Sequence, residues 1–391
     1  MAVKGYLGTW VQVHTMQQTI HPEFPHPDSL VYLNHAAVAP LPKRAGEAII
    51  RFANENVERG SQCYPEWLQT EKTLHQQLQQ LINAPLVADI ALVKNTSEAL
   101  SMVAYGLDWH SGDNVVSSDE EFPSNRIVWQ SLSRFGVSFR EANLTKTSSP
   151  EQALFDCVDH QTRLLTISSV QFSSGIRLDL EAIGAFCKQH GILFCVDAIQ
   201  SLGVQQFDVQ ACQADFVMAD GHKWMLGPEG LGLFYTTADA RDQLQLTQYG
   251  WHMIEQCGVY DNLPWTIAGS ARRFECGSSN MLGIHALSAS LSLLLETGID
   301  QVEQAALECA EYLAVKIASR LNYELVSVRG NQNIQSPILV FKHNKIDNSR
   351  LYQQLQDRGV ICAMRGGGIR FSPHYYHTQA QLDSAMACLP E

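Results

Sequence analysis

Several features that would assign this 391-residue chain to a common functional class are missing from its sequence. No stretch approaches the roughly 20 consecutive apolar residues that span a bilayer, and residues 1–19 hold no continuous apolar run of the secretory type. Lysine and arginine total 27 against 40 aspartates and glutamates, for a formal net charge of -13. Nucleic-acid binding depends on clustered basic residues. We therefore expect a soluble protein with neither a membrane nor a nucleic acid as partner.

Nucleotide-binding and cysteine motifs are also absent. The chain has no G-x-G-x-x-G after a strand and no G-x-x-x-x-G-K-[ST], which disfavours a nucleotide-binding α/β protein. Its ten cysteines, spread from Cys63 to Cys388, include no C-x-x-C pair, and no metal site is predicted. Cys187 and Cys195 lie in apolar runs and are expected to be small buried core residues. Without a signal peptide, a reduced, cytoplasmic protein is the expectation.

What the sequence does contain is an alternation of strand and helix patterns from about residue 80 to 240, typical of a doubly wound α/β sheet. The predicted strands include residues 90–93, 114–117 and 164–167. Asp179 is expected to cap a helix that ends at Gly191. In such sheets the ligand lies beyond the carboxyl ends of the strands.

The pattern changes after about residue 280, and the length of the chain already favours two domains. The elements predicted there are a helix over 301–321, strands at 323–328 and 337–341, a helix over 348–357, two more strands and a last helix from Thr378. We therefore predict an N-terminal arm (1–29), a large α/β domain (30–280) and a small α+β domain (281–391). The arm is expected to pack on the small domain or on a partner subunit.

Two residues at the ends of apolar runs indicate the chemistry. The run Ile192–Val196 leads to Asp197, and the run Phe216–Ala219 leads to Lys223. Alone, such an aspartate is usually a cap or turn residue and such a lysine a solvated charge. Together they are the pair that a pyridoxal 5'-phosphate (PLP) enzyme requires. The lysine forms the Schiff base to the aldehyde, and the carboxylate keeps the pyridinium nitrogen protonated.

The surrounding residues strengthen this interpretation. Asp197-x-x-Gln200 is followed about twenty residues later by Gly221-His222-Lys223 and the glycine-rich segment 226–232. This order resembles the class V aminotransferases of PLP fold type I, whose relatives include cysteine desulfurases, isopenicillin N epimerase-like proteins and kynureninases. The resemblance covers roughly residues 30 to 380. It implies a large, mostly parallel sheet domain that binds PLP and a small C-terminal α+β domain.

The resemblance also assigns cofactor contacts on one side of the pocket. Thr96 and Ser97, at a predicted helix start, would bind the phosphate, since a helix N-terminus favours an anion. Phe122 would stack on the pyridine ring, where cysteine desulfurases usually have a histidine. Phenylalanine cannot titrate, so an acid–base role is lost there. Asp197 would pair with the ring nitrogen.

On the other side, Gln200 would bind the phenolic oxygen of the ring and His222 the phosphate. Lys223 would hold the cofactor and then act as the base that moves the Cα proton. Ser278, in a Phe-Glu-x-Gly-Ser segment, would reach the phosphate of a neighbouring subunit. The resemblance therefore implies a homodimer with shared active sites.

Substrate contacts follow from two further segments. Arg370 matches the arginine that holds the substrate α-carboxylate, for which a planar fork is suited. Asn34 and His35 belong to a segment that lines the substrate side of the pocket in the family. These matches imply an amino acid as the small-molecule substrate, but they do not identify which one.

The reaction is the least determined point. A cysteine desulfurase needs a mobile thiolate before the carboxylate arginine, but only Gly-Gly-Gly-Ile separates Arg365 from Arg370. Because this loop is short and Phe122 replaces the histidine, we predict an aminotransferase that uses Lys223. A PLP-dependent lyase, an epimerase and a cysteine desulfurase-like enzyme remain alternatives. So does a PLP-holding binding or regulatory protein without activity.

Overall fold

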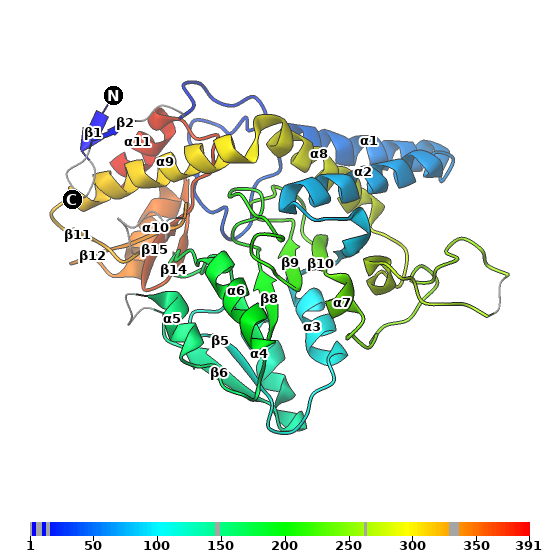
Figure 1. Cartoon of the computed structure of the whole chain (residues 1–391). Coiled ribbons are helices and arrows are strands. Elements are labelled where there is room, and N and C mark those ends of the chain that lie inside the picture. The colour runs from blue at the N-terminus through cyan, green and yellow to red at the C-terminus, as the bar shows by residue number, and fades with distance from the viewer. Residues whose placement is uncertain (1, 5–9, 13–15, 145–148, 262–263, 328–335) are drawn as a thin grey trace.

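A mixed sheet forms the centre of the protein (Figure 1). The computed structural model describes residues 2–4, 10–12, 16–144, 149–261, 264–327 and 336–391. The sheet has seven strands in the order β4-β10-β9-β8-β7-β5-β6. Their bounds are β4 (Ile90–Val93), β5 (Asn114–Ser118), β6 (Ser138–Ala142), β7 (Thr162–Ser168), β8 (Leu193–Asp197), β9 (Phe216–Asp220) and β10 (Gly232–Thr236). Only β10 runs antiparallel to its neighbours. The predicted doubly wound, mostly parallel sheet is confirmed.

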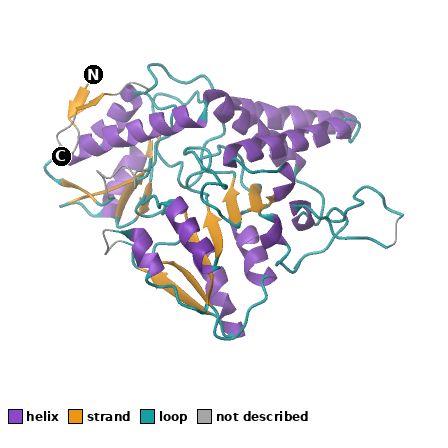
Figure 2. Ribbon diagram, viewed as in Figure 1, coloured by secondary structure: helices purple, strands orange, loops and turns teal. Residues whose placement is uncertain are grey.

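The strands are buried because helices cover both faces of the sheet (Figure 2). Alternate residues of β8 and β9 belong to different cores: Val196 and Val217 pack with α2, α6 and α8, while Cys195 and Phe216 pack with α3 and α4. Burial on both faces explains why these strands are continuous apolar runs. The helices concerned are α2 (Tyr64–Ile82), α3 (Thr96–Gly106), α4 (Ser124–Gln130), α6 (Leu180–His190) and α8 (Met281–Thr297). As predicted, Asp179 caps α6.

A smaller antiparallel sheet, in the order β11-β12-β15-β14, forms the second domain, drawn in orange in Figure 1. Its strands are β11 (Tyr323–Leu325), β12 (Leu339–His343), β14 (Ala363–Arg365) and β15 (Gly368–Phe371). Helices α9 (Ile299–Ala318), α10 (Asn348–Asp357) and α11 (Gln379–Ala387) surround it. The predicted helix over 348–357 matches α10. Part of the predicted strand at 323–328 lies outside the described residues.

The domain boundaries differ from those predicted. Helix α8 packs on α1 (Lys43–Arg59) and α2, and its Leu287 and Leu291 lie in the core of the large domain. Leu33 instead belongs to the small-domain core, and β3 (Val31–Tyr32) pairs with β13 (Val360–Ile361). The change from one core to the other occurs within α9, so neither residue 30 nor residue 280 separates the two domains. Apolar periodicity identifies a buried helix face but not the core that buries it.

The described part of the N-terminal arm contacts both domains, whereas the prediction named the small domain or a partner subunit. Phe24 lies in the core of the large domain, and Glu23 pairs with Arg44 of α1 at 2.8 Å. Met16 lies in the small-domain core, and Gln17 forms a backbone bridge with Thr378. The remaining elements are β1 (Ala2–Lys4), β2 (Trp10–Gln12), α5 (Pro150–Phe155), α7 (Ala238–Arg241) and the 3-10 turns η1 (Val87–Asp89), η2 (Ser131–Phe135) and η3 (Ala271–Phe274).

All ten cysteines are free. In the part of the chain that the structure describes, no single helix is long and apolar enough to cross a membrane, and the pair α8 and α9 meets that test only jointly, across an 85° bend.

Candidate functional site

A cavity of about 290 Å³ lies at the carboxyl ends of β8 and β9, where the sequence predicts a ligand. Asp197 is the last residue of β8, and Lys223 follows β9 after a short turn. The predicted residues that line this cavity are Thr96, Ser97, Phe122, Asp197, Gln200, His222, Lys223 and Arg370. The start of α3, the segment at Phe122, strand β15 and the ends of β8 and β9 thus meet around one cavity.

Asp197 and Lys223 are both buried, and burial determines their protonation. Oδ1 of Asp197 accepts a hydrogen bond from the backbone N–H of Ile199 at 3.0 Å. Desolvation nevertheless raises the pKa of Asp197 to about 7, with a smaller opposing effect from Lys223. Desolvation lowers the pKa of Lys223 to about 8, and the carboxylate of Asp197 partly offsets it. Burial therefore disfavours the charged form of both groups, and the charge of each group partly stabilises the charge of the other.

Phe122 covers one side of the cavity with a partly exposed ring. The centroid of this ring lies 5.5 Å from Nζ of Lys223. Phe172 supports it in an edge-on contact, with the two centroids 5.2 Å apart and the planes at 84°. A flat aromatic surface therefore faces the amine, as stacking on a planar ligand requires.

The first turn of α3 offers donors for an anion. Asn95 caps the helix by accepting a hydrogen bond from the N–H of Glu98. Oγ1 of Thr96 is buried and has no hydrogen-bond partner among the described residues. Ser97 donates to Oγ of Ser124 at 2.9 Å. An unsatisfied buried hydroxyl at a helix N-terminus is the environment that favours a phosphate group.

Gln200 and His222 also face the cavity, each beside a fixed neighbour. The amide of Gln200 donates to the carbonyl of Ala36 at 3.1 Å and accepts from Nε1 of Trp224 at 2.9 Å. One N–H of that amide remains for a ligand. Nδ1 of His222 lies 3.2 Å from Oδ1 of Asp220, although the two atoms lack hydrogen-bond geometry.

Two arginines line the cavity. Nη1 of Arg370, on β15, donates to the carbonyl of Phe172 at 2.8 Å, and its Nε has no partner among the described residues. Burial, together with the nearby Arg365, lowers the pKa of Arg370 to about 10. Arg365 was not predicted as a site residue, because at the end of a short strand it is indistinguishable from a surface arginine.

The turn between these arginines is tight. Gly366 and Gly367 join β14 to β15 with φ values of 60° and 80°. A Cβ at Gly366 would lie 2.2 Å from the carbonyl oxygen of Ser173, so this position requires glycine. A two-residue turn thus joins β14 to β15, in agreement with the short connection between Arg365 and Arg370 noted in the sequence.

No cysteine lines the cavity in the described part of the chain. Cys362, which precedes β14, is buried, and desolvation raises the pKa of its thiol to about 12. A thiol with that pKa carries almost no thiolate at neutral pH. Cys362 is a residue of the small-domain core.

The structure does not bring three predicted residues to this cavity. His35 is fully buried, with Nδ1 2.8 Å from the carbonyl oxygen of Ser372 and Nε2 2.7 Å from the hydroxyl of Tyr376. Asn34 also points elsewhere, and Ala36 and Ala37 line the cavity in its place. Ser278 is exposed between η3 and α8, outside the cavity of its own chain. Its contact with a second subunit stays a prediction.

Sequence reasoning also missed Glu121, a fully buried carboxylate behind Phe122. It accepts hydrogen bonds from N–H and Oγ of Ser168, from Nε2 of Gln171 and from Nδ2 of Asn125, at 2.6 to 2.8 Å. Its charge also raises the pKa of Asp197. In the sequence, Glu121 is the third of three consecutive acids beginning at Asp119, a pattern more typical of a solvated surface.

The chain is similar to known proteins in sequence. Residues 31–385 match the model of the family described as aminotransferase class-V. A protein of Methanothermobacter thermautotrophicus (strain Delta H), named probable cysteine desulfurase, is 30% identical over 378 residues, which is 90% of this chain and 92% of that protein.

Two solved structures share the fold. The cysteine desulfurase CsdA from Escherichia coli matches with a TM-score of 0.83 and 23% identity, over 95% of this chain and 98% of the other. The cystine C–S lyase C-DES, in complex with its reaction product cysteine persulfide, matches with a TM-score of 0.85 and 24% identity, over 92% and 96% of the two chains.

Proposed function

The chain belongs to the class V aminotransferase family of PLP-dependent enzymes, and from this we propose that it cleaves the Cβ–S bond of a cysteine-derived amino acid by elimination. One observation carries the proposal: the cavity combines Lys223, Asp197 and two arginines but, among the described residues, no thiol. The relatives are named as enzymes that act on cysteine or cystine, which supports the Cβ–S bond as the one that is cleaved. The absence of a thiol among the described residues that line the cavity supports elimination over transfer of sulfur to the protein.

The cavity fits the cofactor of the family. The orphan hydroxyl of Thr96 at the start of α3 suits the phosphate, and the ring of Phe122 suits the face of the pyridine. Asp197 would pair with the ring nitrogen, and Lys223 would hold the aldehyde. When bound, PLP supplies an electron sink for negative charge at the substrate Cα.

The residues of the chain then have distinct tasks. Arg370 would bind the α-carboxylate and thereby fix the orientation of the Cα–H bond. The pKa of Lys223, lowered by burial, leaves its amine able to accept the Cα proton near neutral pH. The Cβ–S bond breaks, and its electron pair leaves on sulfur. Water converts the remaining three-carbon enamine into ammonia and pyruvate.

Elimination differs from desulfuration in where the sulfur goes. A desulfurase passes the sulfur atom to its own thiolate and releases alanine, which requires a reactive cysteine beside the substrate. The glycine turn between Arg365 and Arg370 carries no such residue. In elimination the sulfur leaves with its electron pair as a thiolate or persulfide, so no protein thiol is needed.

The second arginine favours a substrate with two carboxylates. Arg365 and Arg370 both line the cavity, and each guanidinium is suited to one carboxylate. Cystine has an α-carboxylate at each end. We therefore propose cystine as a better substrate than cysteine.

Product analysis tests the proposal. PLP-loaded protein is incubated with L-cystine or L-cysteine, and pyruvate, ammonia, persulfide, alanine and pyridoxamine phosphate are measured. Equal amounts of pyruvate and ammonia with persulfide from cystine are expected, and Lys223→Ala should abolish them. Alanine would instead indicate desulfuration, and pyridoxamine phosphate would indicate the transamination that the sequence analysis favoured. Retained PLP with no product would indicate a binding protein.

We also propose that the enzyme is a homodimer. A segment that projects at the right of Figure 1 exposes four large aromatic side chains, which a second copy of the chain would cover. These are Tyr249, Trp251, Tyr260 and Trp265, exposed by 63%, 41%, 78% and 47%. Light scattering after size exclusion would measure the mass. A monomer that holds PLP tightly would contradict both the dimer and the predicted role of Ser278.

A further inference from the structure

A second cluster of titratable side chains lies away from the PLP cavity, on α2. Glu71 and His75 are one helical turn apart, and Glu275 reaches them from the segment that follows η3. Taking one ligand atom from each residue, the three atoms lie within 4.8 Å of one another. Nε2 of His75 is 3.7 Å from Oε1 of Glu275. The three side chains therefore converge on one point.

This spacing suits a metal ion better than direct pairing. Zinc is bound by histidine nitrogen and carboxylate oxygen at about 2.0–2.2 Å, so two ligands in a tetrahedral site lie about 3.3–3.6 Å apart. The separation of 3.7 Å between His75 and Glu275 exceeds hydrogen-bond distance but is close to this value. A cavity of about 410 Å³ adjoins the cluster and gives access to it.

No lysine or arginine in the described part of the chain pairs with the carboxyl groups of the cluster. The side chain of Glu275 is 7% exposed, and its Oε1 accepts a hydrogen bond from the N–H of Leu92 at 2.7 Å. Arg272 lines the same cavity, but its Nη2 donates to two backbone carbonyls instead. Burial raises the pKa of Glu275 to about 8, so without a paired cation its carboxyl group is held largely protonated at neutral pH, and a metal ion bound here would displace that proton.

A fourth side chain provides an independent sign of a missing ligand. Nδ1 of His252 is buried and has no hydrogen-bond partner among the described residues. It faces Oε2 of Glu275 at 3.6 Å, on the opposite side of the carboxylate from His75. Buried polar atoms are nearly always hydrogen-bonded, so an orphan atom directed at a carboxylate needs an explanation.

We propose that Glu71, His75 and Glu275 form a binding site for a divalent transition-metal ion such as Zn²⁺. Nδ1 of His252, 3.6 Å from Oε2 of Glu275, would hydrogen-bond that oxygen when the carboxylate turns to hold the ion, as partners of metal ligands commonly do. The imidazole ligand favours zinc or a similar ion over calcium and magnesium, which prefer all-oxygen sites. The ion would tie α2 to the segment after η3, and the site does not depend on the reaction proposed above.

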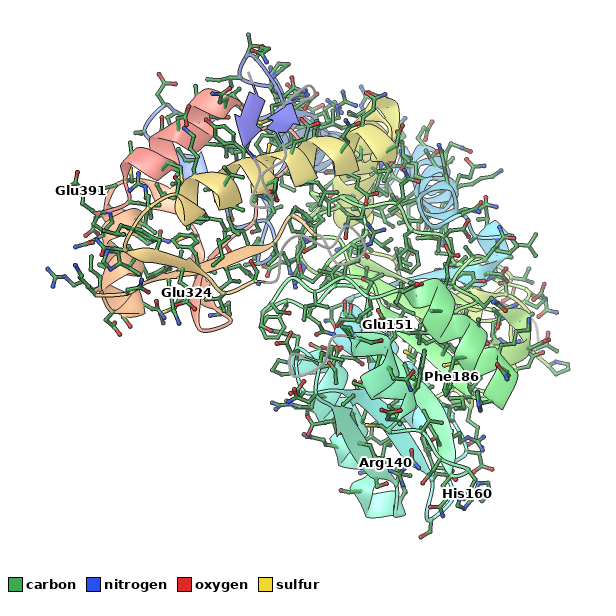
Figure 3. The ribbon with its side chains drawn as sticks, turned by 60° about the vertical axis from the view of Figure 1, so that its left-hand side comes forward. Arg140, Glu151, His160, Phe186, Glu324 and Glu391 are labelled. Atoms are coloured by element: carbon green, nitrogen blue, oxygen red, sulfur yellow. The ribbon has the colours of Figure 1, made fainter. Side chains whose placement is uncertain are left out.

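Metal binding to the full-length, PLP-loaded protein tests the proposal. After treatment with EDTA, Zn²⁺ is titrated by calorimetry. One ion per chain is expected for the wild type and for His160→Ala, a control in an exposed histidine at the outer end of the large domain (Figure 3). His75→Ala should lose this binding. Glu71→Gln should weaken it at least tenfold while it keeps an oxygen that can accept the hydrogen bond from Ser279.

Two further measurements separate this site from adventitious binding to the ten free cysteines. Co²⁺ substitution should give only weak visible bands, because nitrogen and oxygen ligands lack the intense charge-transfer absorption of thiolates. Zn²⁺ should raise the melting temperature of the wild type and the control but not of His75→Ala. Three results would overturn the proposal. These are the absence of stoichiometric Zn²⁺ binding, binding by both His75→Ala and Glu71→Gln that equals binding by the wild type, and a Co²⁺ spectrum with the intense bands of thiolate ligands.

Discussion

Replacing Glu121 by glutamine tests how the buried network behind Phe122 supports the site. The substitution conserves shape but replaces one carboxylate oxygen by an NH₂ group. Oε1 of Glu121 accepts three hydrogen bonds and Oε2 accepts two, so the new NH₂ must face donors at either position. If it takes the place of Oε2, it meets Nδ2 of Asn125 and Oγ of Ser168. The hydroxyl of Ser168 can rotate and accept, but the amide of Asn125 cannot do so without turning over.

The cost follows from these contacts. Turning the amide of Asn125 would break the bonds that its Oδ1 accepts from Trp129 at 2.8 Å and Thr166 at 2.7 Å. Leaving it in place keeps one buried donor unsatisfied, which costs about 1–3 kcal/mol, and the remaining bonds lose the contribution of the charge. We expect Glu121→Gln to lower the free energy of unfolding by about 3 kcal/mol.

Urea unfolding of wild type, Glu121→Gln and Glu120→Gln at pH 7.5 measures this difference. Glu120 is the adjacent acid, only partly buried and bonded to Ser174, so its substitution should cost less than about 1 kcal/mol. Removing the charge of Glu121 should also lower the pKa of Asp197, because that charge raises it. The reasoning is refuted if Glu121→Gln is no less stable than Glu120→Gln.

Three further predictions concern the site and the turn beside it. Arg370→Lys should raise the KM for the amino acid by about 10- to 100-fold, since a charged hydrogen bond contributes about 1.5–3 kcal/mol; an unchanged KM in steady-state assays contradicts its role. Protein freed of PLP should capture the cofactor faster as the pH rises through about 8, where the amine of Lys223 becomes neutral, and should reach a plateau above it; rates that still climb at pH 10 in stopped-flow absorbance count against the lowered pKa. Gly366→Ala should destabilise the fold by about 1–3 kcal/mol more than Gly230→Ala. Both positions have positive φ, but of the two only Gly366 lacks space for a Cβ. Equal melting temperatures of the two variants would exclude the clash.

The sequence allowed the large sheet to be predicted because its strands are short apolar runs between recognisable caps. Ile90–Val93 matches β4, and the cap at Asp179 and the end at Gly191 bound α6 as expected. The allocation of α8 to a domain could not be predicted, because the position of its apolar face says nothing about the partner. Contacts between α8 and the early helices α1 and α2 join segments more than two hundred residues apart.

The candidate site, like the fold, was predictable only in part. Asp197 and Lys223 were predictable because Asp197 ends a buried strand and Lys223 follows the next one, and neighbouring parallel strands bring their ends together. Arg365 and Glu121 were not, because Arg365 is an exposed residue that the fold of the small sheet brings to the cavity, and Glu121 is buried by distant segments. His35 illustrates the opposite case: the resemblance placed it at the substrate, but its two ring nitrogens are occupied by Ser372 and Tyr376 from the small domain.

Helix α9 has a consequence for how the molecule moves and unfolds. Its first half contributes Val302 and Ala306 to one core, and its second half contributes Leu313 and Ile317 to the other. An uninterrupted helix resists sharp bending unless a proline or a bulge interrupts it, so α9 couples the two cores mechanically. Heat should melt both domains in one cooperative transition, because neither core can dissolve without exposing the apolar stripe of the helix they share.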